Sequence, residues 1–133
     1  MYSRTRDITN DLGACLRVTV ASHPSGALVT LERRDQQHRP SISLNLYGAE
    51  LLLGFIMSAR LAGPDMLPDE ATDTPFSSRF HLDYQPTARV VVEQDESFPL
   101  VIDAPLWDRL YAELCLVTAH GRELARRAEM SLH

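Results

Sequence analysis

The sequence predicts an α+β protein made of two tandem units, each with three antiparallel strands followed by one helix. The first observation is that short stretches of alternating apolar and polar residues, the pattern of half-buried strands, precede each of two longer stretches with a helical period. The second observation is that this order occurs twice, over residues 14–63 and 80–128. We therefore expect curved antiparallel sheets with the helices packed on one face, within a single domain spanning residues 1–133.

The three strands of the first unit are expected to form a meander. Residues 14–20 and 27–32 alternate in hydropathy and are joined by His23-Pro24-Ser25-Gly26, a sequence typical of a type I turn. A polar turn then leads to a third strand from Ser41. Short connections of this kind join neighbouring antiparallel strands. The polar residues 1–13 are expected to form a loose arm, with a short strand as the alternative.

A helix with almost no polar face is expected from Gly48 to Ala62. Gly63 and Pro64 are typical of a helix end, because glycine readily adopts the left-handed conformation and proline cannot continue the helix. The residues expected on the inward stripe of this helix are Leu52, Phe55, Ile56 and Ala59.

Four further apolar residues of this helix lie off the inward stripe. A helix that is apolar nearly all round needs cover on more than one side. We therefore predict a homodimer interface formed by Leu51, Leu53, Met57 and Leu61. The alternative is that the second half of the same chain covers these residues.

Residues 64–79 are rich in proline, aspartate, threonine and serine, and we expect them to form an acidic linker without a strand or helix of its own. The four acids of this segment lack the alternating spacing and the central glycine of a calcium-binding loop. We therefore expect residues 64–79 to be solvated and not to bind a metal ion.

The second unit repeats the order of elements of the first, with three strands expected between residues 80 and 102, the last of them from Phe98. The second strands of the two units overlay at a spacing of 61 residues, and the last strands and helices overlay at a spacing of 58. Leu44 then falls on Ile102, and Asn45 falls on Asp103. Identity between the units is low, so the repeat is one of pattern more than of sequence.

The last helix is expected to begin after Asp103, which is placed to cap it. Arg109 and Glu113 stand one helical turn apart, the spacing of an exposed ion pair. The sequence leaves open whether the helix breaks at Gly121 or continues to about Arg127. Its expected inward stripe is Leu106, Leu110, Leu114 and Val117, flanked by Trp107 and Tyr111.

The composition is that of an ordinary globular domain, with 44% apolar and 23% charged residues in a chain of 133. Neither helical stretch contains the ~18 successive apolar residues of a membrane span. The N-terminal residues lack the apolar segment of a secretory signal, so we expect a cytoplasmic protein of bacterial origin without a membrane partner. Cys15 and Cys115 are expected to be reduced, buried thiols.

No catalytic arrangement of residues stands out in the sequence. The five histidines are scattered without metal-ligand spacing, and the sequence contains no glycine-rich phosphate loop, nucleophile elbow or zinc-protease motif. Cys115 could meet His81 or His120 as a nucleophile pair, but a thiol beside the buried stripe of a helix is usually inert. We therefore expect no enzymatic activity, no cofactor and no metal.

All thirteen basic residues are arginines, and the formal net charge is −5, so the overall field opposes binding of a nucleic acid. Arginines are nevertheless expected on the open sheet face or near it. The candidate nucleic-acid contacts are Arg17, Arg33, Arg34, Arg39 and Arg89. Exposed aromatic residues for base stacking are missing from this prediction, because Phe80, Tyr84 and Trp107 fall on core-facing positions.

The order of strands and helix resembles that of the PUR and Whirly families of single-stranded nucleic-acid binders, whose units carry four strands before the helix. The resemblance covers most of the chain at the level of element order, and no sequence motif accompanies it. It implies an open sheet face that binds single strands and helices that pair between copies.

The first functional hypothesis is a small non-enzymatic regulatory or protein-binding module that acts as a homodimer, with a further protein as a possible partner. The second hypothesis is a protein that binds single-stranded nucleic acid on the open sheet face. An enzyme ranks third.

Overall fold

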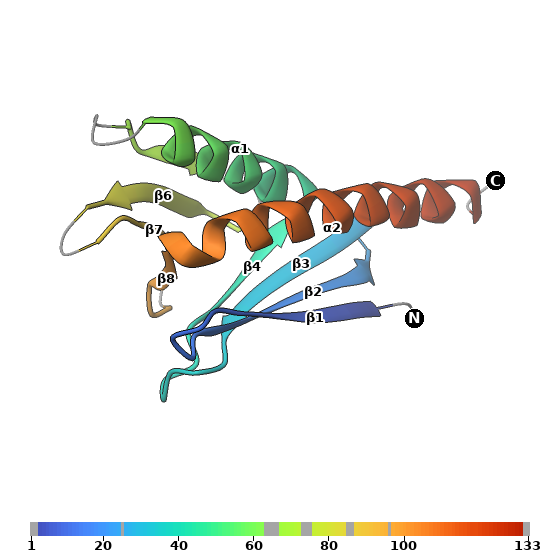
Figure 1. Ribbon diagram of the computed structural model, residues 1–133. Helices are drawn as coiled ribbons and strands as arrows, with labels where there is room; N and C mark the ends of the chain where they lie inside the picture. The colour runs from blue at the N-terminus through green and yellow to red at the C-terminus, as the bar shows by residue number, and fades with distance from the viewer. Residues whose placement is uncertain are drawn as a thin grey trace.

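The computed structural model of the chain describes residues 3–24, 26–62, 67–72, 76–84, 87–95 and 97–131. It contains two four-stranded antiparallel sheets, each followed in the chain by a helix, and both helices pack against the sheets (Figure 1). The predicted α+β architecture of two sheet-and-helix units is therefore confirmed. Each sheet has one strand more than the sequence predicts.

Sheet A comprises β1 (Ser3–Thr9), β2 (Cys15–His23), β3 (Gly26–Arg33) and β4 (Ser41–Asn45), paired in that order. Alternate residues along β2, β3 and β4 are buried, as the hydropathy pattern predicts. Helix α1 (Leu46–Ala62) follows β4 directly and begins two residues earlier than predicted. Its start is fixed by Asn45, whose Oδ1 accepts a hydrogen bond from the backbone N–H of Gly48 at 2.8 Å.

Sheet B comprises β5 (Glu70–Thr72), β6 (Ser78–Asp83), β7 (Arg89–Gln94) and β8 (Leu100–Asp103), again paired in chain order. Helix α2 (Ala104–Ser131) follows β8 without a connecting residue. The last strand was expected from residue 98 but begins at Leu100, which leaves Phe98 in the preceding loop.

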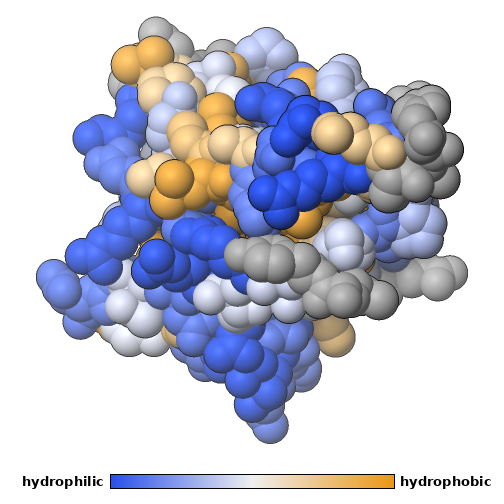
Figure 2. Space-filling model, turned by 90° about the vertical axis from the view of Figure 1, so that its right-hand side faces the viewer, coloured by the Kyte–Doolittle hydropathy of each residue, from blue (hydrophilic) through white to orange (hydrophobic). Residues whose placement is uncertain are grey.

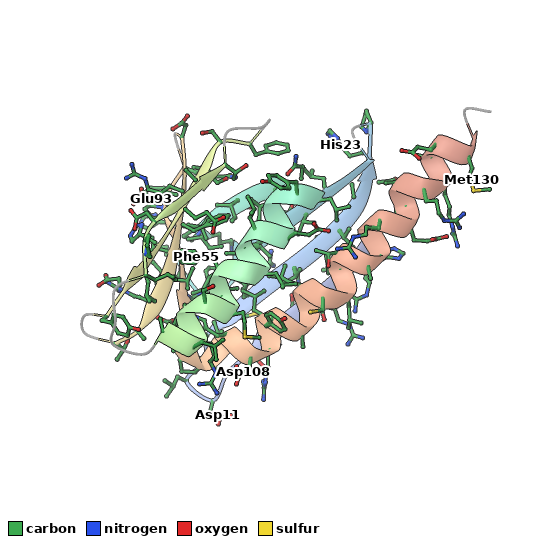
Figure 3. The ribbon with its side chains drawn as sticks, turned by 90° about the horizontal axis from the view of Figure 1, so that it is seen from above. Asp11, His23, Phe55, Glu93, Asp108 and Met130 are labelled. Carbon is green, nitrogen blue, oxygen red and sulfur yellow. The ribbon has the colours of Figure 1, made fainter. Side chains whose placement is uncertain are left out.

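The two helices pack across both units. Besides β8 of its own unit, α2 contacts β1, β2 and β3 of sheet A, whereas α1 contacts β3 and β4 and reaches β6 of sheet B. The ring of Phe55 in α1 lies between that helix and sheet B, 5.9 Å from the ring of Phe80 (Figure 3). Each helix therefore helps to bury the sheet of the other unit, and the two units share one hydrophobic core.

The predicted inward stripes of both helices are confirmed by burial. The buried members in α1 are Leu52, Phe55, Ile56 and Ala59, and those in α2 are Leu106, Leu110, Leu114 and Val117, together with Trp107. The indole N–H of Trp107 donates to the carbonyl of Ile102 at 2.8 Å, which satisfies its polar atom inside the core.

β1 confirms the alternative of a strand within residues 1–13, in place of a loose arm. Its hydropathy pattern is weak because only Ile8 among its residues is buried. Polar contacts with α2 hold the strand instead: Arg4 pairs with Glu113, and Arg109 donates to the carbonyl of Thr9. The expected pair between Arg109 and Glu113 is therefore replaced by two contacts that tie α2 to the edge of sheet A.

β5 corrects the expectation that residues 64–79 contain no element. The strand has three residues, of which only Thr72 is buried, so it leaves no alternation that a sequence pattern could detect. β6 also begins inside the predicted linker, at Ser78. The predicted helix-end signals Gly63 and Pro64 lie outside the described residues.

α2 continues through Gly121 as one helix, which settles the question that the sequence leaves open. Gly121 lies where α2 crosses sheet A and α1. A Cβ atom at this position would stand 3.0 Å from Leu46 Cδ1 and 3.4 Å from Ala27 Cβ. The glycine is therefore explained by close packing and not by a helix break.

We expect Gly121→Val to lower the free energy of unfolding by about 1–3 kcal/mol, because the added methyl groups overpack the contact with Leu46 and Ala27. Gly54→Val is the matched control, since a Cβ there meets no atom within 4 Å. Equilibrium urea unfolding measures both variants. Equal stability of the two variants would contradict the close packing of α2.

Candidate interaction surfaces

The outer surface of the helix pair exposes apolar side chains of α1. α1 and α2 run antiparallel side by side (Figure 3), because Arg60 near the end of α1 pairs with Asp108 near the start of α2 at 3.0 Å, and Glu50 pairs with Arg122. Between these ion pairs, Met57 is 36% exposed and Leu61, further along α1, is 77% exposed. Charged side chains of the two helices thus pair with each other, while the apolar side chains of Met57 and Leu61 are exposed to solvent.

The four residues of the predicted dimer interface do not lie equally far out. Met57 and Leu61 are exposed, whereas Leu51 and Leu53 are partly buried against the core. Helical periodicity places Leu53 on the side of α1 that faces α2 and Leu51 on the opposite side. A cavity of about 180 Å³ lies on the α2 side, lined by Ile56, Met57, Arg60, Asp108 and Tyr111.

α2 contributes small and apolar residues to the same surface. Ala112 and Ala119 are exposed, and Leu116 is 56% exposed. Cys115 is also exposed, so the prediction of a buried thiol at this position is wrong; Cys15 is half-buried. The hydropathy pattern was misleading because Cys115 follows the buried Leu114 in the sequence, whereas neighbouring side chains of a helix point in different directions.

The open face of sheet A, turned away from the helices, carries a row of hydroxyl groups. Thr5, Thr19, Thr30 and Ser43 lie opposite one another in register across all four strands. The hydroxyls of Thr5 and Thr19 are 3.3 Å apart. In Figure 2, most orange surface lies in the upper half, where the helices are, and the lower half is mainly blue and near-white, the hydropathy of charged and hydroxyl residues.

A row of charged residues runs beside the hydroxyls on the same face. Arg17 forms two hydrogen bonds with the carboxylate of Asp7, at 2.8 and 3.1 Å, and Arg34 pairs with Glu32 at 2.8 Å. The Arg17 guanidinium holds the pKa of Asp7 below its ordinary value. These predicted nucleic-acid contacts therefore lie near the open face, but each is neutralised by a carboxylate.

Arg33 has a different position from the one predicted. Its side chain is 4% exposed, on the core side of sheet A, and it donates to the carbonyl of Val101 at 2.6 Å and to Asp103 at 3.4 Å. Two further hydrogen bonds, at 2.9 and 2.8 Å, join it to Asp35. Arg33 therefore connects sheet A to sheet B and is not available to a ligand.

Gln94 makes the reciprocal connection from sheet B. Its Oε1 accepts from the backbone N–H of Ser43 at 3.2 Å, and its Nε2 donates to the carbonyl of Ser43 at 2.5 Å and to the hydroxyl of Ser78 at 2.8 Å. The side-chain amide of Gln94 thus bonds both the N–H and the carbonyl of Ser43, as the backbone of a neighbouring strand would at the edge of β4. A shallow polar groove of about 480 Å³ lies beside it, lined by Ala71, Ser77, Ser78, Arg79, Glu93, Gln94 and Asp95. Glu93 lies on the outer side of sheet B (Figure 3).

The remaining arginines follow the same rule of pairing. Arg89 pairs with Asp83 at 2.8 Å. At least nine of the thirteen arginines form an ion pair with a carboxylate. Within the described ranges, no carboxylate partner is recorded for Arg6, Arg39 or Arg79. Free positive charge is therefore confined to a few separate positions in this part of the chain.

Two exposed aromatic rings meet where the units adjoin, a feature that the sequence analysis missed. His38, in the loop between β3 and β4, stacks on Phe98, in the loop between β7 and β8, with ring centroids 4.9 Å apart and planes inclined by 23°. Phe98 is 60% exposed. Nothing in the sequence indicates this exposed ring, because Phe98 directly precedes the apolar residues of β8 and was assigned to that strand.

The described residues contain neither a cluster of metal ligands nor a helix that could cross a membrane. Among those residues, no three histidine, cysteine or acidic side chains could hold a metal ion together. In the same ranges, neither helix has the combination of length and hydropathy that crossing a membrane requires.

We expect Arg33→Ala to lower the free energy of unfolding by about 1–3 kcal/mol, because it removes the buried guanidinium that donates to the carbonyl of Val101 and leaves that carbonyl without its donor. Arg34→Ala is the matched control; its pair with Glu32 is about one-third exposed on both sides, and its loss should cost about 1 kcal/mol or less. Urea unfolding of both variants measures the difference. Similar losses would contradict the role of Arg33 between the sheets.

The ion pair of Asp35 also predicts a pH dependence. Arg33 lowers the pKa of Asp35 from 3.8 to about 2, so its carboxylate stabilises the fold above about pH 4, and this contribution is lost as the pH falls toward 2. In Asp35→Asn, the free energy of unfolding should fall less steeply over this range, by about 2 kcal/mol at most. Urea unfolding at a series of pH values tests this, with the exposed Asp108→Asn as control. An Asp35→Asn protein with the wild-type acid slope would refute it.

The sequence matches no family model and no curated protein. The best candidates for binding a partner are therefore the surfaces whose apolar or charged groups lack a partner among the described residues.

Proposed function

We propose that this chain is a non-enzymatic regulatory or protein-binding module that acts as a homodimer through the outer surface of α1 and α2. The observation that carries this proposal is the exposure of Met57 and Leu61 on a helix whose opposite side is core. Apolar side chains gathered on one exposed surface mark protein interaction sites more often than scattered ones do.

A second copy of this chain is the favoured occupant of the surface. Two antiparallel helices can pack on the same two helices of a second copy in a two-fold arrangement, in which each copy uses the same residues. Ala112 and Ala119 are exposed small residues that would let the helices of the two copies approach closely. Leu53 and Leu51 would border the contact on its two sides.

We expect the wild-type protein to have the mass of a dimer in solution, and Met57→Glu and Leu61→Glu to have the mass of a monomer. A carboxylate in the middle of an apolar contact would be buried without a partner, which opposes association. Size-exclusion chromatography with light scattering gives the mass, and circular dichroism shows whether each variant is folded.

The matched control is Leu12→Glu, which places the same charge on an 86% exposed leucine in the turn between β1 and β2. This variant should remain a dimer. A monomeric wild-type protein, or dimers that persist in both helix variants, would refute the proposed interface.

Single-stranded nucleic acid on the open face of sheet A is the second candidate function. The observation that favours it is the row of hydroxyl groups across four strands, together with the four strands per unit that the PUR and Whirly resemblance implies. The ion pairs of Arg17 and Arg34 weigh against it, because neutralised arginines attract phosphates weakly. Arg33 does not belong in its test, since replacing this residue would disturb the contact between the sheets.

A further inference from the structure

The two loops that carry His38 and Phe98 form a composite surface at one end of the seam between the units. Each ring uses one face in the stack, and the ring of Phe98 remains 60% exposed. Arg39 follows His38, is exposed, and has no carboxylate partner among the residues that the structure describes. The same loop thus carries one ring of the stack and, on the next residue, an exposed guanidinium that forms no ion pair among the described residues.

Several hydrogen bonds hold the loop between β3 and β4, which carries His38. The backbone N–H of Arg33 donates to the carbonyl of Pro40 at 2.9 Å, and that of Arg39 donates to Gln36 at 3.0 Å. Asp35 accepts hydrogen bonds from Arg33 and from the backbone N–H of Cys15 at 3.1 Å. A loop closed in this way presents its side chains with little conformational entropy left to lose on binding.

The backbone of Arg39 is in the left-handed region, with φ at +45°. Non-glycine residues adopt this conformation uncommonly, and when the surrounding structure enforces it, the position is often functional. On the other side of the stack, Phe98 lies between a turn, in which Ser97 N–H donates to Gln94 at 3.3 Å, and Pro99. Both rings are therefore held on constrained backbone.

We propose that this loop surface binds a nucleotide, with the base stacked on the ring pair of His38 and Phe98 and the phosphate paired with Arg39. A nucleotide combines a flat base with an anionic phosphate, and aromatic side chains bind unstacked bases through their faces. The site lies on the loops, apart from both the helical surface and the hydroxyl row, so the inference does not depend on the proposed dimer. A free nucleotide and a nucleotide within a single strand share this chemistry.

The stacking contribution distinguishes this site from electrostatic binding along the sheet. The net charge of −5 opposes a polyanion, and one arginine neutralises one phosphate. The logarithm of the binding constant should therefore fall with the logarithm of salt concentration with a slope of about −0.7, the value for a single contact to a single strand. Binding along the sheet face through several arginines would give a steeper slope.

The test is a fluorescence-anisotropy titration of the full chain with labelled single-stranded DNA of about 12 nucleotides, with unlabelled AMP as competitor. Phe98→Ala and His38→Ala should each weaken binding by about fivefold or more, the effect expected for loss of one base stack. Arg39→Ala should weaken binding and remove most of the salt dependence. Displacement of the DNA by AMP would identify a free nucleotide as sufficient, whereas binding of DNA alone would identify a strand.

The controls are matched in exposure and charge. Tyr47→Ala removes an aromatic side chain on α1 that is 59% exposed, and Arg79→Ala removes an arginine on β6 that forms no ion pair among the described residues; both should bind like the wild type. All variants are compared by circular dichroism, and truncation of exposed rings should leave the fold intact. Failure of both DNA and AMP to bind, or binding unchanged in Phe98→Ala, would overturn the proposal. DNA binding that Arg17→Gln abolishes and Phe98→Ala leaves intact would also overturn it, and would place the ligand on the sheet face.

Discussion

The fold depends on a pair of equivalent contacts between its two units. Arg33 ends β3, Gln94 ends β7, and the overlay spacing of 61 residues makes them counterparts. Arg33 donates to the carbonyl of Val101, and Gln94 donates to the carbonyl of Ser43. Val101 and Ser43 are themselves counterparts at the spacing of 58, so the seam has approximate two-fold symmetry. The side chains differ, but each satisfies the backbone of the strand at the edge of the other sheet, where an open edge would otherwise invite pairing with another chain.

The same approximate symmetry explains the electrostatics of the helices. Glu50 and Asp108 are counterparts, and each pairs with an arginine of the other helix. Arginine suits these positions because its planar guanidinium can bind a carboxylate through two hydrogen bonds. Most arginines are used in this way, and the two surfaces proposed to bind partners are the apolar surface on α1 and the stacked rings on the loops. Interaction through those surfaces depends on burial and stacking more than on net charge, as an acidic protein requires.

The sequence was sufficient to predict elements whose burial follows a simple period. Alternation located β2, β3 and β4, and the helical period located the stripes that include Leu52 and Leu110, because each of these elements faces the core with one side. It was insufficient for β1 and β5. These edge strands are held by hydrogen bonds and ion pairs, such as the pair between Arg4 and Glu113, and they bury few apolar residues. The location of Arg33 was missed for a related reason: its inward position was read as a surface charge, since its partner Val101 lies 68 residues away.

The ring pair shows why a composite surface escapes a repeat-based interpretation. His38 and Phe98 occupy the corresponding loops of the two units, so neither unit contains the stack by itself. Comparing the units with each other reveals what they have in common, which here is the framework of strands and helices. A surface formed by divergence between corresponding loops is hidden from that comparison. Because the seam contacts hold the two units together, two ordinary loop residues form one stacked pair of rings, which neither unit could form alone.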